Sequence, residues 1–254
     1  MRLNRTYCHI NLSSFFSSCI FTVFFVAAFF SFKNADAQYD PGKLAVLVIG
    51  NGVAPLTSDA TPVFIKQFNI TGTSQAGTLK TTLPTTYVSA TTSVNRAVTQ
   101  SGTGTSEGYI GLSADRQYLV VTGYNSSAGT AAIASTPVTS FPQNSRVVAK
   151  IDAAGTVDSK TTLNTFYSGV AIRSAASVDG SAFWAAGAGG IGYILSGNTN
   201  GAVSSLSTVN SRIAAIIDQQ LYVSSGTTGL RIGKVGTGTP VAAGQTITNL
   251  DGLV

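Results

Sequence analysis

Residues 114–123, ADRQYLVVTG, contain the pattern from which the fold is predicted, and it recurs at residues 178–187 (VDGSAFWAAG) and 217–226 (IDQQLYVSSG). In each copy an apolar residue and an aspartate begin a turn, an apolar strand follows, and a glycine stands eight residues after the aspartate. We expect each aspartate to cap a tight turn with its own side chain, and each glycine to adopt positive φ at the strand exit. The predicted turn residues are Asp115, Gly123, Asp179, Gly187, Asp218 and Gly226.

The spacing of such patterns indicates repeated four-stranded sheets. Residues 68–73 (FNITGT) resemble residues 151–156 (IDAAGT), 83 positions later, which is close to twice a propeller blade of roughly 40–45 residues. The last two aspartates of the first pattern are 39 residues apart, and the first two are 64 apart, which requires an inserted loop. We therefore predict an all-β fold, a β-propeller-like repeat of antiparallel four-stranded sheets with about 4–5 blades and not necessarily complete.

Short apolar runs bounded by turn residues predict the strands themselves. Thr and Val favour strands and Gly marks turns, and no stretch shows sustained helical periodicity with caps. The expected strands are residues 44–49, 63–68, 109–112, 118–122, 146–151, a strand from 156 onwards, 182–186, 191–195, 212–217, 221–224 and 230–235.

The N-terminus has the features of a secretory signal peptide. Arg2 and Arg5 precede an apolar core at residues 20–30, and residues 35–37 (Ala-Asp-Ala) supply the small residues that a signal peptidase recognises. We expect residues 1–37 to be removed and the protein to be secreted to an extracellular location.

Residues 38–254 are the expected mature domain. The alternative is a protein anchored in the membrane by an uncleaved segment at residues 15–32, an apolar stretch that approaches the roughly 20 residues needed to span a bilayer. Cys8, His9 and Cys19 all belong to the leader, so the mature domain contains neither cysteine nor histidine. A Ser–His–Asp triad, a cysteine nucleophile, a disulfide framework and an ordinary zinc site are excluded for this domain.

Charge and motifs exclude further functions. Of 15 basic and 10 acidic residues, three basic and one acidic belong to the leader, which leaves 12 against 9 and no basic run that could bind nucleic acid. The glycine-rich residues 187–192 (GAGGIG) are followed by a strand rather than a helix, which favours a hairpin turn over a dinucleotide loop. With no calcium-binding loop motif either, we expect no cofactor and no metal.

Glu107, the only glutamate, is the one weak candidate for catalysis. A glycosidase-like pair of Glu107 and an aspartate would need two carboxylates about 5–9 Å apart. The simpler interpretation is a solvated loop residue, and for Asp115, Asp179 and Asp218 the simpler interpretation is repeated turn formation.

Other residues have structural interpretations beside functional ones. Arg96, Arg146, Arg173 and Arg212 each precede a strand, where they could ring an anionic ligand or, more simply, act as edge charges. Trp184, the only tryptophan, is expected in the core. Asn69 and Asn125 begin glycosylation sequons on predicted turns, which matter only in a eukaryotic secretory pathway.

Several segments distributed along the mature chain carry a resemblance to known proteins. They are residues 95–99 (NRAVT), 106–115 (SEGYIGLSAD), 146–155 (RVVAKIDAAG), 172–180 (IRSAASVDG) with Phe183-Trp184, and 221–226 (LYVSSG). In these segments the sequence resembles a family of secreted, largely uncharacterised β-propeller-like repeat proteins. The resemblance covers nearly all of the mature chain and transfers no activity. Similar chains continue past the position that matches Leu250, so the resemblance implies an incomplete propeller.

Two function classes follow from these features. We expect a non-enzymatic extracellular binding or scaffold protein, whose loops present a surface to an unknown glycan or protein partner. The alternative is a carboxylate-dependent carbohydrate-active enzyme that uses Glu107. Contact with a membrane is expected only if the leader stays uncleaved.

Overall fold

The computed structural model describes residues 39–90, 93–199 and 202–253. The chain divides into two units, Met1–Asp36 and Ala37–Val254, and the described residues belong to the second. The predicted signal peptide and the alternative membrane anchor at residues 15–32 lie outside the described residues. Within the described ranges, no helix is long and apolar enough to cross a membrane.

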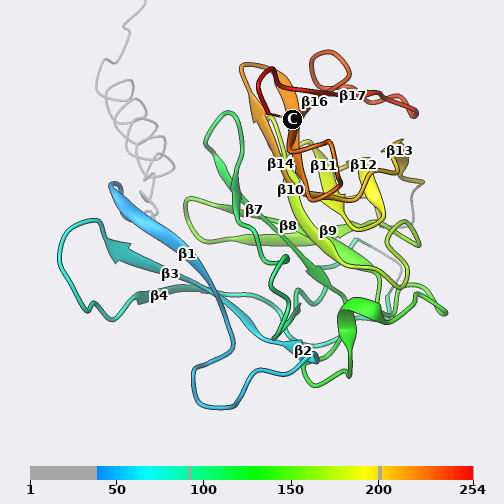
Figure 1. Cartoon of the computed structure of the whole chain (residues 1–254). Helices are drawn as coiled ribbons and strands as arrows, with labels where there is room; N and C mark the ends of the chain where they lie inside the picture. The colour runs from blue at the N-terminus through cyan, green and yellow to red at the C-terminus, as the bar shows by residue number, and fades with distance from the viewer. Residues whose placement is uncertain (1–38, 91–92, 200–201, 254) are drawn as a thin grey trace, which may run out of the picture. The chain divides into compact units, whose positions relative to one another are not determined.

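The described unit is built from antiparallel β-sheets (Figure 1), which confirms the all-β prediction. Three four-stranded sheets follow one another, and in each the strands lie side by side in chain order. We number them second to fourth, because a smaller sheet comes before them in the chain. The second sheet contains β6 (Gly111–Leu112), β7 (Tyr118–Tyr124), β8 (Arg146–Asp152) and β9 (Val157–Thr162). The third sheet contains β10 (Ile172–Ala176), β11 (Ala182–Gly187), β12 (Gly190–Leu195) and β13 (Ser204–Ser207), and the fourth contains β14 (Ser211–Ile217), β15 (Gln220–Ser225), β16 (Ile232–Val235) and β17 (Ile247–Asn249).

A smaller sheet precedes these three in the chain. The first sheet consists of β1 (Lys43–Ile49), β3 (Val63–Asn69) and β4 (Thr78–Thr82), with β3 in the middle. Two short strands, β2 (Ala60–Thr61) and β5 (Gln100–Ser101), pair with each other as a separate two-stranded ribbon. One 3-10 turn, η1, spans Ile133–Ser135.

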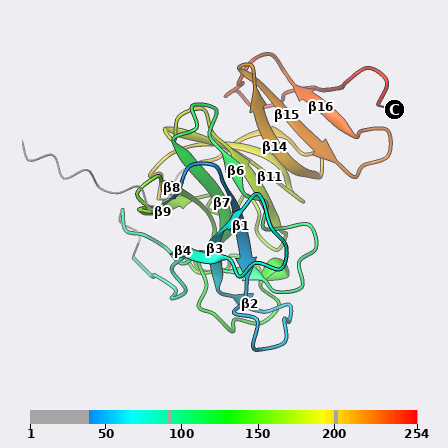
Figure 2. The ribbon, with the colours of Figure 1, turned by 90° about the vertical axis from the view of Figure 1, so that its left-hand side faces the viewer.

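The four sheets pack face to face in chain order, because their strands are apolar on both faces. Successive side chains of a strand point to opposite faces. In β7, Leu119 and Val121 therefore pack against the first sheet, whereas Val120 and Tyr124 pack against the third. Trp184 of β11 lies in the core between the third and fourth sheets, as predicted. A view from a second side shows the fourth sheet beside the third (Figure 2).

The long interval between the first two aspartates has a structural explanation. Asp115 lies in the turn between β6 and β7, and Asp179 lies in the equivalent turn between β10 and β11 of the next sheet. The additional length is the connection from β7 to β8, residues 125–145. A corresponding connection, residues 50–62, joins β1 to β3.

The role predicted for the three glycines is wrong, because Gly123, Gly187 and Gly226 do not have positive φ. Gly123 and Gly187 lie within β7 and β11, where neighbouring backbone approaches closely. A Cβ at Gly123 would lie 2.8 Å from the carbonyl oxygen of Thr99, and a Cβ at Gly187 would lie 2.5 Å from that of Ala171. Glycine is required there for close backbone contact rather than for a turn.

The third aspartate turn also differs from the prediction. Asp218 and Gln219 form a two-residue connection between β14 and β15 with φ values of 47° and 60°. Positive φ at both central residues is typical of a type I′ hairpin, in which backbone conformation makes the turn. Among the described residues no hydrogen bond involves the Asp218 side chain, so of the three aspartates of the repeated pattern only Asp115 and Asp179 cap their turns.

Candidate functional site

Glu107 lies in the segment before β6 and is half-buried rather than solvated. The Tyr124 hydroxyl donates a hydrogen bond of 2.8 Å to its Oε2. Burial raises the pKa of Glu107, and this effect is opposed by the Tyr124 hydrogen bond and by the positive charges of Arg146 and Arg173. Glu107 is therefore part of an internal polar cluster, which the loop interpretation did not anticipate.

The cluster lacks the partner that a glycosidase requires. Within the described part of the chain, the charged side chains that act on Glu107 are Arg146 and Arg173, and neither is a carboxylate. No group of three or more His, Cys, Asp or Glu residues in the same ranges could hold a metal ion. The arrangement stabilises a buried acid electrostatically and does not provide a second acid for catalysis.

The interpretation of the arginines as edge charges is wrong for three of the four. Arg96, Arg146 and Arg173 are buried, and Arg212 is exposed. The Arg146 guanidinium donates five hydrogen bonds, all of them to backbone carbonyl oxygens. It also lies 5.0 Å from the centre of the Tyr124 ring, a cation–π geometry. These arginines hold loops in place instead of discouraging strand pairing.

Glu107→Gln is expected to change how stability depends on pH. Because the folded-state pKa of Glu107 is raised, its stabilising effect is complete below the ordinary glutamate pKa of about 4.3 and is lost as pH rises through the raised value. The glutamine variant stays neutral and escapes this loss, which amounts to roughly 1.4 kcal/mol for each unit of pKa shift. Urea unfolding between about pH 4 and pH 7 measures the difference. The exposed-site variant Asp251→Asn serves as the control, and a Glu107→Gln curve parallel to wild type contradicts the assignment.

Three aspartates from two neighbouring sheets line one surface pocket of about 290 Å³, together with Gln117 and Tyr118. Each uses Oδ1 within its own turn, where Asp115 accepts from the Gln117 N–H, Asp152 from the Thr156 N–H and Asp179 from the Ser181 N–H. In the described residues, the three Oδ2 atoms have no hydrogen-bond partner. We call this the aspartate pocket, and its lining presents unused acceptors to solvent.

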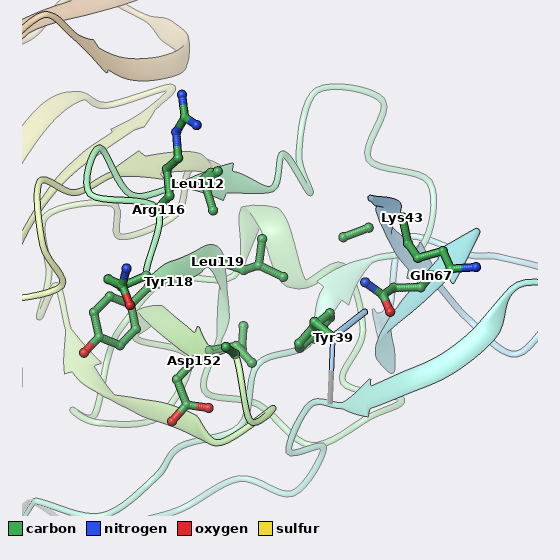
Figure 3. A pocket seen from close by; sticks show the side chains of 12 residues that line it. Tyr39, Lys43, Gln67, Leu112, Arg116, Tyr118, Leu119 and Asp152 are labelled. Atoms are coloured by element: carbon green, nitrogen blue, oxygen red, sulfur yellow. The ribbon is translucent and has the colours of Figure 1, made fainter. Parts of the chain in front are cut away.

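A second pocket of about 300 Å³ adjoins the first and shares Gln117, Tyr118, Asp152 and Ala153 with it. Figure 3 shows Lys43 and Gln67 on one wall, and Tyr118 and Asp152 on the other, with Leu119 between them. We call it the tyrosine pocket, because Tyr39 and Tyr118 both line it.

Tyr118 is held firmly between the two pockets. The ammonium group of Lys150 lies 5.2 Å from its ring centre and donates a hydrogen bond of 2.8 Å to the Gly180 carbonyl oxygen. A Cβ at Gly180 would lie 2.8 Å from the ring, so glycine allows the turn to pack against it. The hydroxyl of Tyr118 has no partner among the described residues and stays available to a ligand.

The two sequons occupy contrasting environments. Asn69 is exposed at the end of β3. Asn125 is fully buried, and its side-chain amide makes four hydrogen bonds to the backbones of Val88, Ala97 and Pro142. Glycosylation of Asn125 is incompatible with this packing, so that part of the sequence prediction is corrected, and Asn69 is the accessible sequon.

Comparison of the chain with protein-family models finds no match, and comparison with curated proteins finds none either. The candidate site therefore depends on geometry alone. The sequence assigns no binding role to Tyr39, Gln67 or Tyr118, which come from distant segments. The signals near the pockets are the repeated Asp115 and Asp179 turns, the first of which leads into Tyr118, and the pattern at residues 151–156, which contains Asp152.

Proposed function

We propose that this is a secreted, non-enzymatic binding protein whose successive four-stranded sheets are blades of a β-propeller-like domain. The chain order of strands within the second, third and fourth sheets supports the blade assignment. So do the neighbouring positions of their first strands, β6, β10 and β14. The leader at residues 1–37 supports export.

The ligand that fits best is a neutral or amino-bearing glycan bound across the two pockets. The observation that carries this proposal is Tyr118, an aromatic ring with an available hydroxyl between two pockets that contain unused carboxylate oxygens. Carboxylates accept hydrogen bonds from sugar hydroxyls, and an aromatic ring contacts the apolar face of a sugar. Asp115, Asp152 and Asp179 disfavour an acidic group in the aspartate pocket through charge repulsion. The tyrosine pocket is lined by Lys43 and Arg116 as well as Asp152, so this exclusion applies to the aspartate pocket.

Tyr118→Ala is expected to weaken glycan binding at least tenfold, which corresponds to about 1.4 kcal/mol. A glycan array identifies the ligand, and calorimetry then measures the dissociation constant for the wild type and variants. Tyr87→Ala is the matched control, because Tyr87 is partly buried and lines neither pocket. Asp152→Asn keeps an oxygen for the Thr156 N–H but replaces the second oxygen with a donor, so it is expected to weaken binding as well.

The array also tests the competing assignments. If no glycan binds at micromolar concentration and a defined protein binds through the same pockets, the ligand is a protein and the glycan assignment is wrong. A carboxylate-dependent enzyme is the alternative that the raised pKa of Glu107 favours, since a general acid requires such a shift. Cleavage of a glycan by the wild-type protein would overturn the non-enzymatic proposal. If Glu107→Gln then left turnover unchanged, the alternative of an enzyme that uses Glu107 would be eliminated.

A further inference from the structure

The fourth sheet has one apolar face that nothing in the described residues covers. Ala214, Leu221 and Val223 pack against the third sheet, so the alternate residues of β14 and β15 point the other way. On that bare face Ile213 is 41% exposed, Ile217 is 57% exposed and Ile232 is 42% exposed. These residues line a hollow of about 490 Å³ with Ala215, Tyr222 and Leu250.

The first sheet has a bare apolar face as well. Val63 and Ile65 of β3 pack against the second sheet, so Phe64 and Phe68 point away from it. Residues directly opposite on neighbouring strands share a face. Leu44 pairs with Phe68, and Leu79 pairs with Lys66, so both leucines lie on this outer face, where they are 56% and 53% exposed.

The sequences of β1 in the first sheet and β14 in the fourth sheet are typical of strands that are buried on both faces. A strand with one solvated face alternates apolar and polar residues, whereas a strand buried on both faces is an unbroken apolar run. Residues 44–49 (LAVLVI) and 213–217 (IAAII) are unbroken runs, and so is the start of β7, whose two faces are both packed. Bare apolar faces of this kind are typical of interaction surfaces.

The existing junctions define what should cover each face. Three junctions join the four sheets. In each, the face of one sheet that points toward the next sheet in the chain meets the face of that next sheet that points back. The bare face of the fourth sheet is of the first kind, and the bare face of the first sheet is of the second kind. Pairing two like faces of two copies would leave the other kind uncovered on both.

We infer that the occupant of each bare face is a second copy of this chain, joined head to tail. The fourth sheet of one copy packs on the first sheet of the other, and twofold symmetry repeats the junction on the opposite side. The described residues of two copies then contribute eight sheets of three or four strands, a number within the 4–8 blades of closed propellers. The closed arrangement covers every bare face, whereas an open one would grow into filaments.

Light scattering coupled to size exclusion tests the number of copies. The wild-type protein is expected at twice its chain mass. Ile217→Asp and Leu79→Asp change exposed positions on the two bare faces, and each is expected to give a folded monomer. Each monomer should still unfold cooperatively, at a temperature below that of the wild-type dimer, because the stabilisation by association is lost. Leu195→Asp is the matched control, since Leu195 is 57% exposed in the third sheet and lies on neither bare face. A wild-type monomer at tens of micromolar concentration overturns the inference.

Cross-linking tests the head-to-tail order. In a background of Cys8→Ser and Cys19→Ser the chain has no other cysteine, so Leu44→Cys and Ile217→Cys can be placed singly. At the existing junctions the first strand of one sheet lies against the first two strands of its neighbour, so β1 rather than β4 should face β14. A short bis-maleimide is expected to link a Leu44→Cys chain to an Ile217→Cys chain in a mixture, and to leave either chain alone mostly unlinked. Efficient links within a single variant would mean that like faces meet, and would refute the proposed order. Glycan binding is measured separately, so failure here leaves the proposed function standing.

Discussion

Arg146→Met is expected to lower the free energy of unfolding by about 4 kcal/mol, the largest single effect we anticipate. The variant keeps much of the side-chain volume but removes all five guanidinium hydrogen bonds. Their acceptors are buried or partly buried carbonyl oxygens, and a buried acceptor without a partner costs roughly 1–3 kcal/mol. The change also removes a positive charge beside the half-buried Glu107.

The loss should be concentrated in two loops. Arg146 binds the carbonyl oxygens of Ala134 and Thr136 in the β7–β8 connection, and that of Val170 in the β9–β10 connection. These contacts tie both loops to the start of β8. We expect the variant to be cut by proteases within residues 125–145 well below its global unfolding temperature.

Chemical denaturation and limited proteolysis check this prediction. Arg212→Met is the control, because Arg212 is an exposed arginine near the start of β14 in the fourth sheet. Its replacement should change stability by no more than about 0.5 kcal/mol. Equal effects of the two substitutions would show that the Arg146 hydrogen bonds contribute little.

Asn125→Ala is expected to cost about 3 kcal/mol. Its Nδ2 donates to the carbonyl oxygens of Val88 at 2.9 Å and Pro142 at 3.0 Å, and its Oδ1 accepts from the N–H groups of Val88 and Ala97. No water can replace the lost partners without a cavity large enough to admit it. The amide therefore joins three chain segments that share no strand pairing at this point.

Asn69→Ala provides the comparison, since Asn69 is exposed and its loss should be nearly neutral. Urea midpoints measure both effects. Expression in a eukaryotic secretory host, followed by deglycosylation and mass spectrometry, should show glycan on Asn69 and none on Asn125. Folded protein with a glycan on Asn125 would contradict the buried position.

Much of the fold could be predicted because apolar runs and turn residues act locally. The runs at residues 44–49, 118–122 and 146–151 match β1, β7 and β8 within two residues at either end. Six strands were missed, and they are short or rich in Thr, Ser and Ala: β2, β4, β5, β10, β13 and β17. Their pairing is imposed by neighbouring strands, so the local sequence shows little of it.

The glycines show a different limit of sequence reasoning. The repeated pattern predicts where glycine is needed but attributes it to turn conformation, whereas Gly123 and Gly187 are required by the close approach of backbone from other segments. The same is true of the candidate site. The position of Tyr118 after a turn says nothing about Gln67 or Lys43 on the facing wall, because only packing of the first and second sheets brings them near.

The connections at residues 50–62 and 125–145 hydrogen-bond to each other: Ala60 donates to Thr130 at 2.8 Å, and Gly129 donates to Ala60 at 2.8 Å. Ala132 adds a bond to the Asp59 carboxylate. Shortening either connection alone would leave backbone groups of the other without their hydrogen-bond partners, so both connections would have to be exchanged together. Natural insertions and deletions should likewise occur in both connections at once.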